Sequence, residues 1–333
     1  MKTISKFNKL SLSLSLLLTS ASSFAADKVT FQLDWLPGGD KAPVYVGVQQ
    51  GFFAEQDLDV TILGGKGSTD AITKIATGTA DIGSADIVAL LVAKANDNVP
   101  VKAIYSLFSK APYAFYVLDD SGINSVKDVS GKTIATSPFT SANVFLPLML
   151  KKNGIEEESV KVLKADPGAL NPMLITGQSD VMISWMTDRV KNEQQAAEAG
   201  KKLTVLPWYD AGLEFYSSSI IASDKFMSEN PDVVKRFVKA YAKAVEYTWA
   251  HPEESGAYVT KMVPEVDSKQ AADTIKSIHG LVMNEVSQRD GVGQFTPSRL
   301  SETWKWTAEA QGLDLSKLDP ETAVDRQFYE GVN

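Results

Sequence analysis

The chain of 333 residues contains no cysteine and only two histidines. The lack of cysteine excludes disulfide bridges, thiolate zinc sites, iron–sulfur ligation and thiol nucleophiles. Both histidines, His251 and His279, lie in the last third of the chain, away from the loops that we expect to bind a ligand. No nucleophile–base–acid pattern or metal-ligand spacing is visible. We therefore expect a protein that is not an enzyme and that needs no metal and no other cofactor.

Long apolar runs are also missing. No segment approaches the roughly 18 uninterrupted apolar residues of a membrane-spanning helix. Residues 10–18 form a short apolar stretch diluted by serines, three lysines precede it, and residues 23–25 are suited to signal cleavage. This pattern predicts a cleavable signal peptide over residues 1–25 and a location in the periplasm, with an N-terminal membrane anchor as the alternative.

The chain has no basic tract, and its formal net charge is −8. Cleavage of the expected signal removes three lysines and no acidic residue, which leaves a charge of −11. An acidic protein of this kind is a poor partner for nucleic acid, so we expect none. The remaining chain of about 308 residues is too long for one ordinary hydrophobic core, and its length predicts two domains.

Strand and helix patterns alternate through most of the chain, which predicts an α/β fold with mostly parallel sheets flanked by helices. The last third is mostly helical. We expect that tail to pack back onto the first α/β unit, so that the chain crosses between units near residues 110–114 and 210–215. The expected strands are 28–33, 58–63, 80–83, 101–108, 114–118, 132–135, 160–163, 180–184 and 216–222, and the expected C-terminal helices are 231–251, 252–261, 268–284 and 297–310.

Because the chain is expected to cross twice between the two α/β units, we predict two lobes with a ligand cleft between them. Lobe I is expected to be discontinuous and to consist of residues 26–112 plus 214–333. Lobe II is expected to span residues 113–213. The two lobes form the walls of the cleft and would close on one ligand by a hinge motion. We expect the protein to be a monomer.

Short motifs mark both α/β units and the helical tail. They are Asp-Trp-Leu-Pro at 34–37, Ala-Pro-Val-Tyr-Val-Gly at 42–47, Gly-Phe-Phe at 51–53, Leu-Asp-Val at 58–60, Gly-Thr-Ala-Asp-Ile-Gly at 78–83, Gly-Gln-Ser-Asp-Val at 177–181 followed by Trp185, Asn-Pro-Asp-Val-Val-Lys-Arg-Phe at 230–237, and His-Pro-Glu at 251–253.

With these motifs the chain resembles the periplasmic binding proteins of ATP-driven importers for thiamine-pyrimidine precursors, which are relatives of aliphatic-sulfonate and nitrate binders. The resemblance covers nearly the whole chain after the signal. It implies a type II periplasmic binding protein fold and two partners, a small-molecule ligand and an importer permease in the inner membrane. Related enzymes that synthesise the thiamine pyrimidine rely on histidine and cysteine clusters, which this chain lacks.

One position departs from the family pattern. Members that bind the pyrimidine precursor often carry a histidine just before the Ala-Pro step, where this chain has Lys41. A fixed cation in place of a neutral ring favours a ligand with an anionic or carbonyl-rich edge, unless Asp40 pairs with Lys41.

The candidate ligand-binding residues lie in loops that follow the predicted strands, where ligands bind in open α/β sheets. Tryptophan could stack on a planar ligand, and hydroxyl groups at helix starts could bind polar oxygens. Core packing, helix capping and a packed hinge are the alternative interpretations. The candidates are Trp35, Asp40, Lys41, Tyr45, Gly67, Ser68, Thr69, Ser84, Asp86, Tyr113, Thr140, Ser141, Asn143, Trp185 and Glu214.

We expect a protein that captures a small planar molecule, a nitrogen heterocycle similar to a thiamine-pyrimidine precursor, and delivers it to an importer permease. A binder of an aliphatic sulfonate, nitrate or another small anion is the alternative. A pyrimidine-synthesising enzyme on the same fold is a more distant one.

Overall fold

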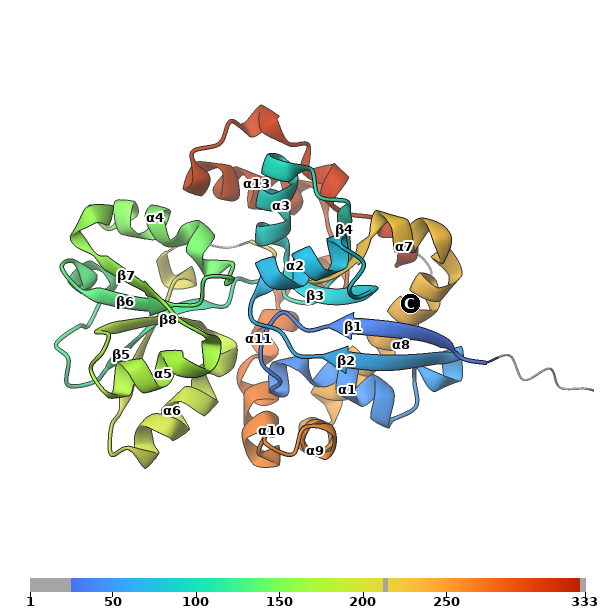
Figure 1. Ribbon diagram of the computed structural model, residues 1–333, viewed down its shortest axis with the longest axis horizontal. Helices are drawn as coiled ribbons and strands as arrows, with labels where there is room; N and C mark the ends of the chain where they lie inside the picture. The colour runs from blue at the N-terminus through green and yellow to red at the C-terminus, as the bar shows by residue number, and fades with distance from the viewer. Residues whose placement is uncertain (1–24, 212–214, 330–333) are drawn as a thin grey trace, which may run out of the picture.

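The computed structural model describes residues 25–211 and 215–329. It contains two five-stranded sheets, each flanked by helices, that lie next to each other (Figure 1). The predicted two-lobed α/β architecture is confirmed. No helix within the described residues is both long enough and apolar enough to cross a membrane.

The first sheet has the strand order β2-β1-β3-β10-β4. Four of its strands come from the N-terminal part of the chain, and β10 is added after the chain returns from the second lobe. The strands are β1 (Asp27–Gln32), β2 (Leu58–Leu63), β3 (Ile82–Asp86), β4 (Val101–Ser106) and β10 (Ser218–Ser223).

The second sheet has the strand order β7-β6-β8-β5-β9 and is built from one continuous stretch of chain. Its strands are β5 (Tyr113–Leu118), β6 (Thr133–Thr136), β7 (Lys161–Lys164), β8 (Val181–Trp185) and β9 (Leu203–Pro207).

Each sheet contains one strand that runs against the others. In the first sheet β10 pairs antiparallel with β3 and β4, and in the second sheet β5 pairs antiparallel with β8 and β9. Each reversed strand is the first one that the chain forms after it crosses over from the other sheet. The sheets are thus mostly parallel, as predicted, with the exception confined to the two entry strands.

Helices cover both faces of the first sheet. The helices α1 and α8 pack together on one side, and α2 and α3 lie on the other (Figure 1). The chain's helices are α1 (Ala42–Gln49), α2 (Ser68–Ala76), α3 (Ile87–Asp97), α4 (Ala142–Lys152), α5 (Pro167–Ile175), α6 (Arg189–Glu198), α7 (Asp224–Glu229), α8 (Pro231–Ala250), α9 (Pro252–Met262), α10 (Ser268–Ser277), α11 (His279–Val282), α12 (Glu285–Asp290) and α13 (Pro297–Gln311).

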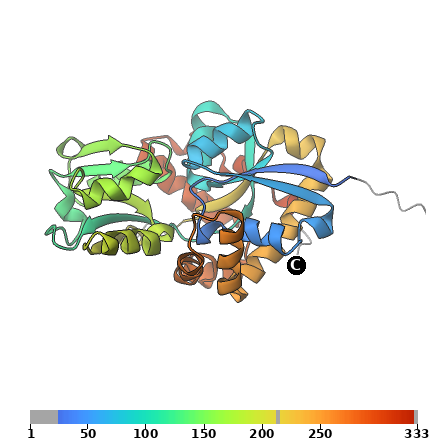
Figure 2. The same ribbon diagram turned by 60° about the horizontal axis from the view of Figure 1, so that its bottom comes forward.

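The C-terminal helices connect the two lobes as well as covering the first. Helix α13 contacts α4 of the second lobe, where the side-chain amide of Gln311 donates to the carbonyl of Val144 at 2.7 Å. Helix α10 contacts α6, and Figure 2 shows α9 and α10 projecting forward beneath the first sheet. The expectation that the tail packs on the first unit is confirmed by the contacts of α8 and α9 with α1. The exact lobe boundaries stay a prediction.

Two local expectations are wrong. The helix expected over residues 268–284 is broken into α10 and α11, and Asn284 begins α12 because its side chain accepts from the backbone N–H of Val286 and Ser287. No element was expected between Trp185 and residue 214, yet α6 and β9 lie there. Helix α6 is so polar that it shows no apolar period from which it could have been predicted.

Aromatic rings fill the centre of the first lobe. The buried ring of Phe237, on α8, stacks on Phe53 with ring centroids 4.9 Å apart and on Phe31 at 5.7 Å. Strand β1 and the turn after α1 are thereby attached to the long helix of the tail. This contact holds segments from opposite ends of the chain in one core.

We expect Phe237→Ala to lower the free energy of unfolding by about 3–5 kcal/mol, because it leaves a cavity among packed rings. Urea denaturation of the ligand-free protein measures the loss. Phe139→Ala is the matched control, because that ring is 38% exposed, and we expect it to cost less than about 1 kcal/mol. Equal losses in the two variants would contradict this account of the core.

Candidate functional site

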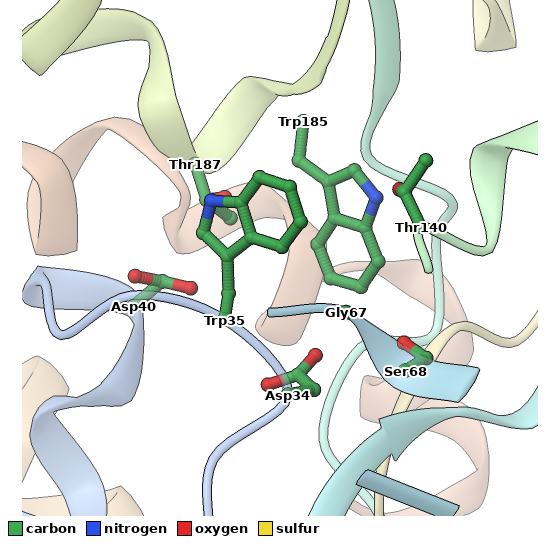
Figure 3. Close-up of a pocket in the computed structure, with 8 residues that line it drawn as sticks. All are labelled: Asp34, Trp35, Asp40, Gly67, Ser68, Thr140, Trp185 and Thr187. Carbon is green, nitrogen blue, oxygen red and sulfur yellow. The ribbon is translucent and has the colours of Figure 1, made fainter. Parts of the chain in front are cut away.

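Loops from both lobes meet in a pocket between the two sheets (Figure 3). The loop after β1 and the start of α2 come from the first lobe, whereas the loop before α4 and the end of β8 come from the second. The space between these loops, counted together with the part that is open to solvent, measures about 230 Å³. Its lining residues are Asp34, Trp35, Asp40, Gly67, Ser68, Thr140, Trp185 and Thr187.

Two tryptophans from opposite lobes turn their rings into this pocket (Figure 3). Trp185 is the last residue of β8, and its ring packs edge-on against Tyr113 at a centroid distance of 5.9 Å. Trp35 lies in the loop after β1 and is half-buried. Two indole faces at one cavity provide an apolar site for a flat molecule.

A buried charged group lies next to the tryptophans. The ammonium group of Lys41 lies 2.7 Å from a carboxylate oxygen of Asp34 and 2.9 Å from one of Asp40. Asp34 also accepts a hydrogen bond from Ser84 at 2.6 Å. The Lys41 ammonium lies 5.6 Å from the centre of the Trp185 ring, so the charged group is in contact with a wall of the pocket.

The two carboxylates keep Lys41 charged although it is buried. Burial alone would lower the pKa of Lys41, but attraction to Asp34 and Asp40 more than offsets this effect and raises the pKa well above its ordinary value. One cation with two carboxylates leaves a net charge of −1. From the sequence alone, Lys41 favours an anionic ligand edge unless Asp40 pairs with it. The structure shows that pair, so Lys41 gives no support for an anionic ligand edge.

Asp86 lies behind the pocket and connects the lobes. One of its carboxylate oxygens accepts hydrogen bonds from Tyr113, from Ser141 at 2.8 Å and from Ser217 at 2.8 Å. The other oxygen accepts from the backbone N–H of Val88 at 3.0 Å and caps α3. Burial raises the pKa of Asp86, and the hydrogen bonds oppose that rise. Asp86 does not line the pocket.

The helix starts that were expected to bind ligand oxygens contact each other across the lobes. The backbone N–H of Thr69, in α2, donates to the carbonyl of Phe139 at 3.2 Å, and the hydroxyl of Ser137 donates to the carbonyl of Lys66 at 3.0 Å. Gly67 has a φ of +153°, and a Cβ atom there would lie 2.3 Å from the carbonyl carbon of Phe139. Only glycine allows the two loops to approach this closely.

The candidates chosen from the sequence fall into three groups. In the first group, Tyr45 is buried on α1, and Asn143 forms hydrogen bonds with Thr136 and Ser137 near its own loop. Glu214 lies outside the described residues. The sequence choice omitted two lining residues, Asp34 and Thr187. Asp34 lies two residues after the end of β1, and Thr187 lies in the turn that follows β8. Trp35, Asp40, Gly67, Ser68, Thr140 and Trp185 line the pocket, and Lys41, Thr69, Ser84, Asp86, Tyr113 and Ser141 make the supporting contacts described above.

Asp188 extends the charged part of the site into the second lobe. It ends the 3-10 turn Met186–Asp188 and accepts a hydrogen bond from Ser184. Burial, followed by the negative charge of Asp40, raises the pKa of Asp188 to about 6. Within the described residues, no group of three or more histidine, aspartate or glutamate side chains is placed to hold a metal ion.

We expect Lys41→Met to lower the free energy of unfolding by about 3–5 kcal/mol, because it leaves two buried carboxylates without a cation. Denaturant titration of the ligand-free variant measures the change. Lys243→Met is the control, since Lys243 pairs with Glu55 at 2.7 Å on the exposed surface and should contribute at most about 1 kcal/mol. The double variant Lys41→Met/Asp34→Asn should recover part of the loss, and a failure to recover any would contradict the charge explanation.

Asp188 should make the folded state less stable as the pH rises from about 4 to about 6. Over that range the folded protein binds more protons than the unfolded chain, because the pKa is about 6 when folded and 3.8 in the reference state. We expect Asp188→Asn to gain up to about 3 kcal/mol relative to the unmodified protein between pH 4 and pH 7. If the free energies of unfolding of the two proteins differ by the same amount at every pH in this range, a raised pKa of Asp188 is ruled out.

Comparison with known proteins finds relatives that are named as enzymes and relatives that are named as binding proteins. The synthase named 4-amino-5-hydroxymethyl-2-methylpyrimidine phosphate synthase from Candida albicans (strain WO-1) is 27% identical over 73% of this chain and 74% of its own length. Riboflavin-binding protein RibY from Chloroflexus aurantiacus is 25% identical over 91% of this chain and 86% of its own length.

A solved structure of another protein has the same fold as this chain. The alkanesulfonate-binding protein SsuA from Xanthomonas axonopodis pv. citri, solved bound to MOPS, matches with a TM-score of 0.71 at 15% identity. The match covers 92% of this chain and all of that one. The prediction of a periplasmic binding protein fold is confirmed.

The expectation that the protein is not an enzyme needs correction. Several relatives, among them the Candida albicans protein, carry the name of an enzyme. The shortage of histidine and cysteine does not exclude catalysis on this fold, because activity depends on the site and not on residue counts.

The resemblance to the superfamily of binding proteins for thiamine-pyrimidine precursors is confirmed at the level of the family. A family model described as NMT1/THI5 like matches residues 39–255, which is more than half of the chain. The chain belongs to the NMT1/THI5-like family.

Proposed function

We propose that the protein captures a small planar nitrogen heterocycle between Trp35 and Trp185. The observation that carries this proposal is the pair of indole rings, one from each lobe, that face a single pocket. A flat ring held between them would bury both of its faces, and aromatic stacking adds about 0.5–1.5 kcal/mol per pair beyond the area buried. Such a ligand would also join the lobes, because each lobe supplies one wall.

The charges around the pocket favour a ligand that donates hydrogen bonds. Asp34 and Asp40 share one lysine, so their carboxylate oxygens retain the capacity to accept from a ring N–H or an amino group. No lysine or arginine is found among the residues that line this pocket. The alternative ligands, sulfonate or nitrate, would meet a site of net charge −1 and are therefore disfavoured.

The same proposal includes delivery to an importer permease. SsuA, which shares this fold, is named a binding protein for alkanesulfonates, and the signal expected over residues 1–25 would direct this chain to the periplasm. Contacts such as that between Thr69 and Phe139 close the lobes. Opening and closing of these contacts would let the permease distinguish the loaded from the empty protein.

Synthesis of a pyrimidine phosphate is a second candidate function. The names of the relatives from Candida albicans and other fungi favour it. Incubation with a stabilising compound, followed by mass spectrometry, separates the two candidates: an unchanged compound supports capture and release, whereas a new mass supports catalysis.

We expect Trp35→Ala to weaken binding of a stabilising heterocycle at least about tenfold, while the melting temperature of the ligand-free protein changes little because the ring is only half-buried. A thermal-shift screen of pyrimidines, purine breakdown products, flavins, sulfonates and nitrate identifies the ligand. A ligand at about 100 times its dissociation constant adds about 2.7 kcal/mol to the free energy of unfolding.

The two parts of that experiment can each contradict the proposal. Stabilisation by sulfonates or nitrate alone would reject the heterocycle. A large loss of stability in ligand-free Trp35→Ala would show instead that Trp35 is a core residue.

A further inference from the structure

Two carboxylates in the wall of the tryptophan pocket are only partly satisfied. Asp34 and Asp40 both line the pocket and are 1% and 5% exposed (Figure 3). The Lys41 ammonium engages one oxygen of each, and the engaged oxygen of Asp34 also accepts from Ser84. The second oxygen of each carboxylate accepts no hydrogen bond from the residues that the structure describes. Two buried acceptors are thus left for a molecule in the pocket.

The charges around these carboxylates leave the pocket negative. Lys41 compensates one of the two, and the residues that line the pocket include no lysine or arginine. The neighbouring charges offset each other: Lys66 is paired with Asp166 at 3.4 Å, and Asp188 and Lys191 lie together in the wall of the adjoining hollow. A neutral ligand would therefore be enclosed with an uncompensated carboxylate, which is costly away from water.

The indole rings favour a positive charge as well, because the face of an indole attracts a cation. The Lys41 ammonium already lies 5.6 Å from the centre of the Trp185 ring. Lys41 does not itself line the pocket. Within the part of the chain that the structure describes, no lysine or arginine lies over the ring of Trp35. That ring is therefore available to a flat cation in the pocket.

We infer that the ligand is a flat cation of the amidinium type, in which a delocalised positive charge lies beside N–H donors. Its flat part would stack at the tryptophans, and its N–H groups would donate to the free oxygens of Asp34 and Asp40. Such charge-assisted hydrogen bonds are stronger than bonds between neutral groups. Both carboxylates hold the same ammonium, so they lie close enough together to meet one small ligand. The inference rests on the proposed function, because it assigns a charge to the ligand of the same pocket.

The test compares flat cations with neutral molecules of the same shape. Benzamidine is a cation at neutral pH and is paired with benzamide, which is neutral. The compound 4-aminopyridine, which is protonated on its ring nitrogen at neutral pH, is paired with aniline. Calorimetry on the full protein should show the cation binding at least about tenfold tighter than its counterpart in one or both pairs, because only the cation compensates the buried charge.

Variants assign the preference to the carboxylates. Asp40→Asn keeps the shape of the side chain and removes one negative charge, so the preference for the cation should fall to about twofold or less. Asp120→Asn is the matched control. It removes the same charge just after β5, where the side chain of Asp120 is 70% exposed, so the preference should remain. If Asp40→Asn does not fold, Asp34→Asn repeats the test with the same change of charge.

The outcomes separate this inference from the proposed function. Neutral molecules that bind as tightly as their cationic counterparts overturn the inference and leave the proposed function standing. The same conclusion follows if a neutral heterocycle binds and neither cation does. A preference for the cation that persists in Asp40→Asn shows that the carboxylates do not hold the charge, which also overturns the inference. Failure of both cations and of every heterocycle to bind would reject the inference and the proposed function together.

Discussion

The two lobes depend on one buried carboxylate. Asp86 ends a strand of the first sheet and accepts hydrogen bonds from Tyr113, where the chain enters the second sheet, and from Ser217, where it returns. Its contact with Ser141 adds the start of a second-lobe helix. A fully buried carboxylate is costly unless several donors surround it. Both crossings of the chain are thereby fixed at one point, directly behind the pocket.

That fixed point determines what the pocket can do. Trp35 and Trp185 come from different lobes, and they reach the same pocket only because both crossings are held together. The charged group of Lys41, Asp34 and Asp40 lies next to the Trp185 ring and is already internally paired. The geometry therefore offers stacking and hydrogen-bond acceptance in this pocket. Both properties suit a flat ligand that donates hydrogen bonds.

Much of the fold could be predicted from the sequence because nine of the ten strands, all except β9, follow local patterns. The β-branched and apolar run of β2 was assigned with the bounds that the structure gives, whereas α6 was missed because seven of its ten residues are polar or charged. The helix expected over residues 268–284 failed at Asn284, whose side chain caps a new helix instead of ending the old one. Helical period alone does not distinguish those two roles.

The sequence by itself determined the family, the two-lobed architecture and the loops from which the pocket is built, because these follow from short motifs and from the alternation of strands and helices. Only the tertiary structure decided which polar groups face a ligand. Asp86, Ser141 and Thr69 are engaged by partners from distant parts of the chain, and Lys41 is paired with Asp34 as well as Asp40. A hydrogen-bonding partner that is remote in sequence leaves no local pattern, so its effect appears only when the chain is folded.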